Sequence, residues 1–227
     1  MTSPPEVASR LFHPIASSYE RWAAVLSLGQ DRRWREALVN GIGLPPGSLV
    51  LDVAAGTGSI TRALTNAGFR VVALDQSPEM LGMLDHEGVP KVLATGERLP
   101  VASGAVDGVT VGYLLRYVED LPGAIAGLAR VVRPGGVVAA LDFGRPHGVW
   151  GPLWWIYTRW MLPLAGLVIG SGWAEVGRFL GPSIDRFWAS HTPEELTARW
   201  TEAGLRDVHW RSMSLGGGFL ILGTRDD

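Results

Sequence analysis

The sequence contains no cysteine among its 227 residues. This absence excludes disulfide bonds, catalysis by a thiol and zinc sites with cysteine ligands. Charged residues are also scarce, at 19%, and the formal net charge of −2 indicates no basic surface for nucleic acid. Hydrophobic residues make up 47% of the chain, which argues against disorder. The composition therefore fits one folded α/β domain with a sizeable core.

The chain also lacks a leader pattern and an unbroken membrane-length apolar run. Residues 1–6 contain no basic region followed by an apolar core, so we expect no signal peptide and a cytoplasmic protein. Residues 149–172 carry four tryptophans among many aliphatic residues, but Arg159 and Pro163 lie near the centre. We expect one or two lid helices there instead of a membrane span. Such a lid covers the core, walls a lipophilic substrate site or contacts a membrane surface, and the last two roles are compatible.

One stretch organises the rest of the chain. The apolar run 49–53 is followed by the turn Ala54-Ala55-Gly56-Thr57-Gly58 and then by apolar residues at helical spacing. A strand, a glycine turn and a helix in this order present backbone N–H groups to a nucleotide-like ligand. The glycines let a ligand lie against the backbone. Thr61 stands where a dinucleotide fingerprint has its third glycine, and the absence of a following Lys-Ser/Thr pair excludes a P-loop.

Two acidic residues lie at the ends of predicted strands near this turn. Asp75 ends the next apolar run, seventeen residues after Gly58, where a carboxylate can accept hydrogen bonds from both hydroxyls of a ribose. Asp52 lies at the end of the first strand. The glycine loop lets a ligand approach the backbone closely, Asp75 can bind a ribose, and no phosphate-binding motif is present. This combination favours S-adenosylmethionine over NAD. The alternative is a glycine turn that only packs a helix on a sheet.

Alternating strand and helix patterns predict a doubly wound, Rossmann-like sheet of seven strands. Residues 205–210 and 219–222, joined by three glycines, predict an antiparallel C-terminal pair, and a tryptophan-rich helical lid follows the fifth strand. We expect a single domain over 1–227. Its segments are an N-terminal helical cap (1–40), a cofactor-binding core (41–145), a lid and substrate insertion (146–200) and the terminal strands (201–227).

Several motifs together resemble class I S-adenosylmethionine-dependent methyltransferases. More narrowly, they resemble the ubiquinone/menaquinone biosynthesis C-methyltransferase family, from about Tyr19 to the C-terminus. The more specific motifs are Ser27-x-Gly29-x-x-Arg32-x-Trp34-Arg35 and Leu115-Arg116-x-Val118. The motifs shared more widely are the loop 51–58, Asp75-Gln76-Ser77-Pro78-Glu79-Met80-Leu81, Glu97-x-Leu99-Pro100 and Arg130-Val131-x-Arg133-Pro134-Gly135-Gly136.

The resemblance implies S-adenosylmethionine as the cofactor and no metal. Two positions depart from the family pattern. Thr95-Gly96 stands where the family usually has Asp-Ala, whose acid meets the adenine amine, and Tyr117 replaces the asparagine of Leu-Arg-Asn-Val. In the family, that arginine and asparagine are thought to deprotonate or orient the quinol. The implied cofactor-binding residues are Asp52, Ala54, Gly56, Thr57, Gly58, Asp75, Gln76, Met80, Thr95, Gly96, Glu97 and Gly112.

Methyl transfer from a sulfonium requires mainly binding, alignment and desolvation, so few residues stand out as catalytic. We expect Arg116, Tyr117 and Tyr19 to act on the acceptor, with Tyr157 and His191 as weaker candidates. Arg116 can pair with a phenolate or quinol oxygen, and the alternative is an ion pair with an adjacent acid, Glu119 or Asp120. His191 precedes a predicted helix start, which favours capping or surface exposure.

The expected function is therefore methyl transfer to a small lipophilic acceptor, either aromatic or quinone-like, with C-methylation favoured by the resemblance. Two alternatives remain open at this stage. One is an O- or N-methyltransferase of secondary metabolism, and the other is a non-catalytic cofactor-binding or membrane-peripheral protein. We expect no nucleic acid partner and leave open a peripheral membrane contact and a homodimer.

Overall fold

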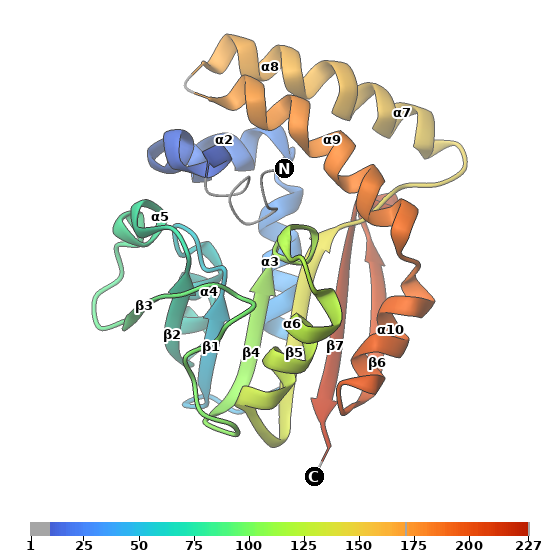
Figure 1. Cartoon of the computed structure of the whole chain (residues 1–227). Coiled ribbons are helices and arrows are strands. Elements are labelled where there is room, and N and C mark those ends of the chain that lie inside the picture. The colour runs from blue at the N-terminus through green and yellow to red at the C-terminus, as the bar shows by residue number, and fades with distance from the viewer. Residues whose placement is uncertain (1–9, 171, 227) are drawn as a thin grey trace.

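The computed structural model describes residues 10–170 and 172–226, which fold around a seven-stranded sheet (Figure 1). The strand order is β3-β2-β1-β4-β5-β7-β6, and β7 is antiparallel to both of its neighbours. This arrangement confirms the predicted doubly wound sheet with an antiparallel C-terminal pair. The strands are β1 (Leu49–Val53), β2 (Arg70–Asp75), β3 (Lys91–Leu93), β4 (Val106–Gly112), β5 (Val132–Phe143), β6 (Leu205–Met213) and β7 (Gly218–Arg225).

The central strand β1 explains why the site forms where it does. Val50 pairs with Val71 of β2 on one side and with Gly108 of β4 on the other, and both pairings are parallel. A strand paired on both sides and covered on both faces requires a nearly continuous apolar run, which residues 49–53 provide. The chain winds outward in opposite directions from β1 and β4, and ligands of such sheets bind at this switch point.

Helices cover both faces of the sheet. Leu38 of α3 and Leu64 of α4 pack with β1 and β7 on one face, whereas Leu128 of α6 and Trp200 of α10 pack on the other. The helical segments are η1 (His13–Ser18), α2 (Tyr19–Leu26), α3 (Gln30–Gly41), α4 (Ser59–Asn66), α5 (Pro78–Met83), η2 (Leu115–Tyr117), α6 (Leu121–Val131), α7 (Trp150–Ile156), η3 (Tyr157–Met161), α8 (Leu162–Ile169), α9 (Trp173–Ser190), α10 (Pro193–Glu202) and η4 (Ser214–Gly216).

The structure differs from the sequence expectation at the start of β5. Proline and glycine in the motif Arg133-Pro134-Gly135-Gly136 favour a turn, after which the apolar run from Val137 would form the strand. Instead, β5 begins at Val132, and its register against β4 shifts between the pairs Val106↔Val132 and Gly108↔Val137. Gly135 has φ +73°, which glycine adopts without strain. The proline and glycines therefore form an irregularity within the strand.

A helical lid follows β5 and crosses the upper edge of the sheet, above α2 (Figure 1). Segments α7, η3 and α8 run without a break from Trp150 to Ile169, η3 being π-helical, and α9 packs against α8. Gly177 permits this close packing, since a Cβ there would lie 2.7 Å from the Leu162 carbonyl oxygen. The predicted insertion 146–200 holds these helices and most of α10; the four-segment division of the chain stays a prediction.

The outer face of the lid is apolar. Trp155, Trp160, Leu164 and Leu167 each expose more than half of their surface, and Val168 is 89% exposed. Within the described ranges, no helix combines the length and the apolar character needed to cross a membrane. The lid therefore presents a large apolar surface to its surroundings.

Candidate active site

The site lies where β1 and β4 end at the switch point of the sheet. The residue after β1 is Ala54, and the residue after β4 is Tyr113. Both have φ +59°, a left-handed backbone conformation that residues with a Cβ rarely adopt. Strained backbone of this kind concentrates at binding and catalytic sites. The two strand ends thus turn sharply on either side of one crevice.

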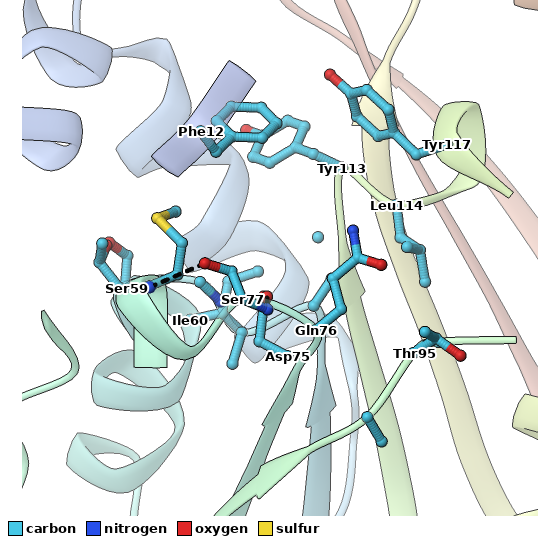
Figure 2. A pocket seen from close by; sticks show the side chains of 18 of the residues that line it. Phe12, Ser59, Ile60, Asp75, Gln76, Ser77, Thr95, Tyr113, Leu114 and Tyr117 are labelled. Carbon is cyan, nitrogen blue, oxygen red and sulfur yellow. Dashed lines mark hydrogen bonds between the residues drawn. The ribbon is translucent and has the colours of Figure 1, made fainter. Parts of the chain in front are cut away.

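A pocket of about 120 Å³ occupies this crevice, and we call it the cofactor pocket. Figure 2 shows Phe12, Tyr113 and Tyr117 along one edge and Asp75, Gln76 and Thr95 along the opposite edge. Ten of the predicted cofactor residues line it, namely Ala54, Gly56, Thr57, Asp75, Gln76, Met80, Thr95, Gly96, Glu97 and Gly112. The structure thus gathers one predicted set, drawn from four separate motifs, around a single pocket.

Asp75 holds the glycine loop and faces the pocket at the same time. Its Oδ2 accepts a hydrogen bond from the Gly56 N–H at 2.8 Å, and its Oδ1 accepts one from the Ser77 N–H at 2.9 Å. Burial raises the pKa of this carboxyl, and the backbone hydrogen bonds partly oppose the rise. Each oxygen of an ionised carboxylate has a second lone pair, so Asp75 can still accept ribose hydroxyls.

Two of the predicted cofactor residues, Asp52 and Gly58, are not among the described residues that line the pocket. Asp52 is fully buried below the loop, where it accepts hydrogen bonds from Thr61 Oγ1 at 2.6 Å and Thr110 Oγ1 at 2.8 Å. Burial raises its pKa to about 6. The carboxyl of Asp52 therefore ties β1 to α4 and β4 and lies behind the pocket wall.

Gly58 shapes the loop without contacting the pocket. It has φ +87°, and a Cβ added there would lie 2.5 Å from Leu84 Cγ. Gly96, which does line the pocket, has a similar constraint, since its Cβ would lie 2.5 Å from Leu114 Cδ2. Position 58 therefore requires glycine for both its backbone conformation and its packing, whereas a Cβ at Gly96 would require the Leu114 side chain to move.

A second cavity, of about 410 Å³, adjoins the cofactor pocket and is mostly apolar. Its wall comes from α2 and α3, from the ends of β4 and β5, and from the lid. Four aromatic residues, Phe12, Tyr19, Tyr113 and Tyr117, line both spaces, and we call them the aromatic collar. Phe12 contacts the rings of Tyr19 and Tyr117 edge-on, with centroids 5.7 and 6.0 Å away. The collar is thus the boundary at which a molecule in one space meets a molecule in the other.

The tyrosines of the collar remain protonated at neutral pH. Burial raises the pKa of Tyr19 to about 12, and burial also raises the pKa of Tyr117. For Tyr113, burial and the neighbouring Asp31 carboxylate both raise the pKa well above its usual value. The Tyr113 hydroxyl donates a hydrogen bond to Asp31 Oδ1 at 2.5 Å. All three hydroxyls therefore keep a proton that they can donate, and that of Tyr113 is donated to Asp31.

Arg116 lines the second cavity and is held in a buried ion pair. Its Nε donates to Asp142 Oδ1 at 2.7 Å, and its Nη1 donates to Ser183 Oγ at 2.6 Å. The side chains of Arg116 and Asp142 are 2% and 0% exposed. Burial lowers the pKa of Arg116, but the Asp142 carboxylate and the Tyr117 hydroxyl together raise it by more, and the net shift is upward. The expected alternative partners, Glu119 and Asp120, are replaced by a residue from β5.

The two weaker candidates have different surroundings. Tyr157 lines the second cavity, and its hydroxyl donates to the Leu26 carbonyl oxygen. Burial raises its pKa to about 12. His191 follows α9, stacks on Phe187 with ring centroids 4.8 Å apart, and lines neither space. In the described part of the chain, no three His, Asp or Glu side chains gather as a metal site would require.

Ten of the residues that line the cofactor pocket were not predicted as site residues, and three of them, Phe12, Arg35 and Tyr113, carry large side chains from different parts of the chain. Tyr113 follows the apolar run 106–111 after a single glycine, and this place at the carboxyl end of a strand was a usable signal. Arg35 belongs to a quoted motif, yet its burial beside the pocket depends on how α3 packs. Phe12 comes from the N-terminal segment, whose contact with the crevice no local pattern indicates.

The model of the ubiE/COQ5 methyltransferase family matches residues 3–224. The chain belongs to the ubiE/COQ5 methyltransferase family. Among its relatives, the demethylmenaquinone methyltransferase of Mycolicibacterium vanbaalenii is 38% identical over 94% of this chain and 92% of that protein. The corresponding protein of Streptomyces avermitilis is 36% identical over 94% and 91%. The predicted family is thereby confirmed.

Solved structures of methyltransferases share the fold. A putative methyltransferase in complex with the Haloferax volcanii Trm112 activator has a TM-score of 0.66 and 18% identity, over 95% of this chain and 98% of that one. A phosphoethanolamine N-methyltransferase of Haemonchus contortus, solved with S-adenosylhomocysteine, has a TM-score of 0.63 and 13% identity over 86% and 53%. The present family member is an S-adenosylmethionine-dependent methyltransferase, and Asp75 with the apolar Ile60 and Leu114 fits the ribose and adenine of that cofactor.

Proposed function

We propose that this enzyme methylates a ring carbon of a small lipophilic quinol. The observation that carries the proposal is the apolar cavity of about 410 Å³ that meets the cofactor pocket at the aromatic collar. A flat, apolar ring in this cavity would lie next to the methyl group of the cofactor. The relatives named demethylmenaquinone methyltransferase, at 36–38% identity, support an acceptor of this class.

Each polar residue of the cavity has a role that follows from its surroundings. Bound S-adenosylmethionine would supply the methyl group by breakage of its S–CH3 bond and leave as the neutral thioether S-adenosylhomocysteine, and the methylated ring carbon would release its hydrogen to solvent as a proton. Arg116 is cationic and almost unexposed, so it would favour the ionised form of an acceptor hydroxyl, and that charge spreads onto the ring carbons. Tyr19 and Tyr117 would donate hydrogen bonds to acceptor oxygens, while Phe12 and the lid exclude water from the reacting atoms.

The test is transfer of a labelled methyl group to a panel of prenylated hydroquinones, simple phenols and amines, with product mass and fragmentation as the readout. We expect a carbon-methylated hydroquinone. Arg116→Gln should lower turnover roughly 100-fold while the affinity for S-adenosylhomocysteine stays unchanged. An equal loss of both quantities would place Arg116 in folding or in the cofactor site.

Methylation of oxygen is the second candidate, and Tyr117 is the residue that favours it. Tyr117 stacks on Phe179, with ring centroids 6.0 Å apart, where the resembled motif has an asparagine. A phenol cannot reproduce the paired donor and acceptor of an amide. The same assay separates the two candidates, because an O-methyl ether loses its methyl group on fragmentation and a ring methyl does not. Failure with every acceptor, despite tight cofactor binding, would favour a non-catalytic role.

We also propose that the outer face of the lid contacts a lipid surface, from which the acceptor enters the cavity. Leu28, Trp150, Leu153 and Leu215 line the cavity and are between 44% and 81% exposed, so its rim is continuous with the apolar surface of the lid. Sedimentation with neutral and anionic vesicles tests this contact. We expect binding by the wild type and its loss in Trp160→Lys. A homodimer in ultracentrifugation, without vesicle binding, would assign the face to self-association.

A further inference from the structure

Arg35 on α3 is a buried cation that lines the cofactor pocket. Its side chain is 11% exposed, and its Nη2 donates to Asp31 Oδ2 at 2.8 Å. Its Nε is buried without a hydrogen-bond partner. A guanidinium has five N–H donors, so this single carboxylate leaves much of its hydrogen-bonding capacity unused. Buried charges in proteins are normally fully paired, which makes Arg35 an unusual feature of the pocket wall.

The charges around Arg35 leave it a net attraction for an anion. Asp31 divides its charge between Arg35 and the Tyr113 hydroxyl, which occupies its other oxygen. Tyr19 and Tyr113 are the nearby phenols, and both remain neutral. Two further carboxylates interact electrostatically with Arg35, but Glu20 is paired with Arg62 and Asp52 accepts hydrogen bonds from two threonines. Burial lowers the pKa of Arg35, but Asp31 and the other neighbouring groups together raise it by more, so the net shift is upward and the side chain stays cationic. The pocket wall thus carries a permanent positive charge that the protein satisfies only in part.

S-adenosylmethionine has a single anionic group, the carboxylate of its amino-acid end. Its adenine and ribose are neutral, and its sulfonium and ammonium are positive and would be repelled by a guanidinium. We propose that Arg35 binds the α-carboxylate of the cofactor and so fixes its amino-acid end against the N-terminal helices. The inference rests on the cofactor and not on the acceptor proposed above. A charge-assisted hydrogen bond to a carboxylate is the strongest that a guanidinium forms.

The Arg35 contact also joins the cofactor to the aromatic collar. Arg35 lines the cofactor pocket, Asp31 lines the second cavity, and Tyr113 lines both. A cofactor carboxylate bound to Arg35 would therefore fix the position of the Arg35 side chain. Asp31, which pairs with Arg35, and the Tyr113 hydroxyl, which donates to Asp31, would be fixed with it. Arg35 would therefore be a cofactor-binding residue that also positions Tyr113 of the aromatic collar.

The experiment compares two ligands by calorimetry on the full chain. S-adenosylhomocysteine has the carboxylate, and 5′-methylthioadenosine lacks the whole amino-acid end. We expect Arg35→Met to weaken S-adenosylhomocysteine at least about tenfold and to leave 5′-methylthioadenosine unchanged. The control is Arg32→Met on the same helix, whose side chain is 83% exposed and pairs with Glu36. It should bind both ligands as the wild type does.

Two results would overturn the assignment. Equal weakening of both ligands would make Arg35 a structural residue, and unchanged affinity for both would remove it from the site. If Arg35→Met fails to fold, Arg35→Lys keeps the charge and should lose only part of the affinity. Wild-type protein offers an independent measurement, since the carboxamide of S-adenosylhomocysteine should bind at least about tenfold more weakly than the acid. Equal binding of the two would likewise refute the proposal. None of these measurements involves an acceptor.

Discussion

The buried pair of Arg116 and Asp142 allows a stability prediction that can be separated from catalysis. Asp142→Asn keeps the shape of the side chain and removes its charge, which leaves the guanidinium at 2% exposure without a counter-charge. Breaking a buried ion pair by removing one partner costs about 3–5 kcal/mol. For a chain of this length, each kcal/mol lowers the melting temperature by roughly 2–4 °C. The expected loss is therefore roughly 6–20 °C.

The informative comparison is with a variant in which the whole pair is apolar. The combined variant Arg116→Met with Asp142→Leu removes both charges, and buried pairs replaced in this way often lose little stability. Urea unfolding, followed by circular dichroism, would measure the free energy of each variant. We expect the combined variant to regain most of the stability but none of the turnover. A single-variant loss below about 1 kcal/mol, or a combined variant no better than Asp142→Asn, would refute the reasoning.

Three further predictions concern the cofactor loop. Asp75→Ala should weaken cofactor affinity at least about tenfold, about 1.4 kcal/mol, because the ribose hydroxyls lose a charged acceptor; unchanged affinity by calorimetry would remove this assignment. Gly58→Ala should cost about 1–3 kcal/mol in urea unfolding, since a Cβ at φ +87° would lie 2.5 Å from Leu84 Cγ. Burial raises the pKa of Asp52 from 3.8 to about 6, so the folded state binds the extra proton and wild-type stability falls as the pH rises through this range. Asp52→Asn should therefore gain on the order of 3 kcal/mol relative to wild type between pH 4 and pH 7, and a constant difference would contradict the shift.

The cofactor pocket could be predicted because its residues lie at local features of the chain. Ala54, Gly56 and Asp75 each follow or end an apolar run, and the carboxyl ends of parallel strands meet at one edge of the sheet. Asp52 shows the limit of this reasoning. An acid at a strand end was expected to reach the ligand, but Thr61 and Thr110 satisfy it below the loop. A strand pattern does not specify which buried partner a carboxylate finds.

The second cavity could be predicted only in outline. The tryptophan-rich segment indicated a wall for a lipophilic molecule, but the wall also needs Tyr113, the N-terminal helices and the end of β5. These segments are distant in the sequence and meet only through tertiary packing. The ion partner of Arg116 illustrates the same point, since the sequence offered only the adjacent acids as alternative partners and Asp142 lies 26 residues away. Sequence spacing therefore predicts which functional residues gather at one strand end more readily than it predicts which residues pair across the sheet.

The π-helical segment Tyr157–Met161 determines the directions in which the side chains of α8 point relative to those of α7. A π segment amounts to one extra residue within an α-helix, and one residue corresponds to a rotation of about 100°. Gly166 now meets α9 so closely that a Cβ would lie 2.4 Å from the Trp173 carbonyl oxygen. Deleting one residue from the segment would turn Gly166 away and drive a bulkier side chain into α9. The glycine contacts between α8 and α9 therefore constrain the length of this segment more than they constrain its residue types.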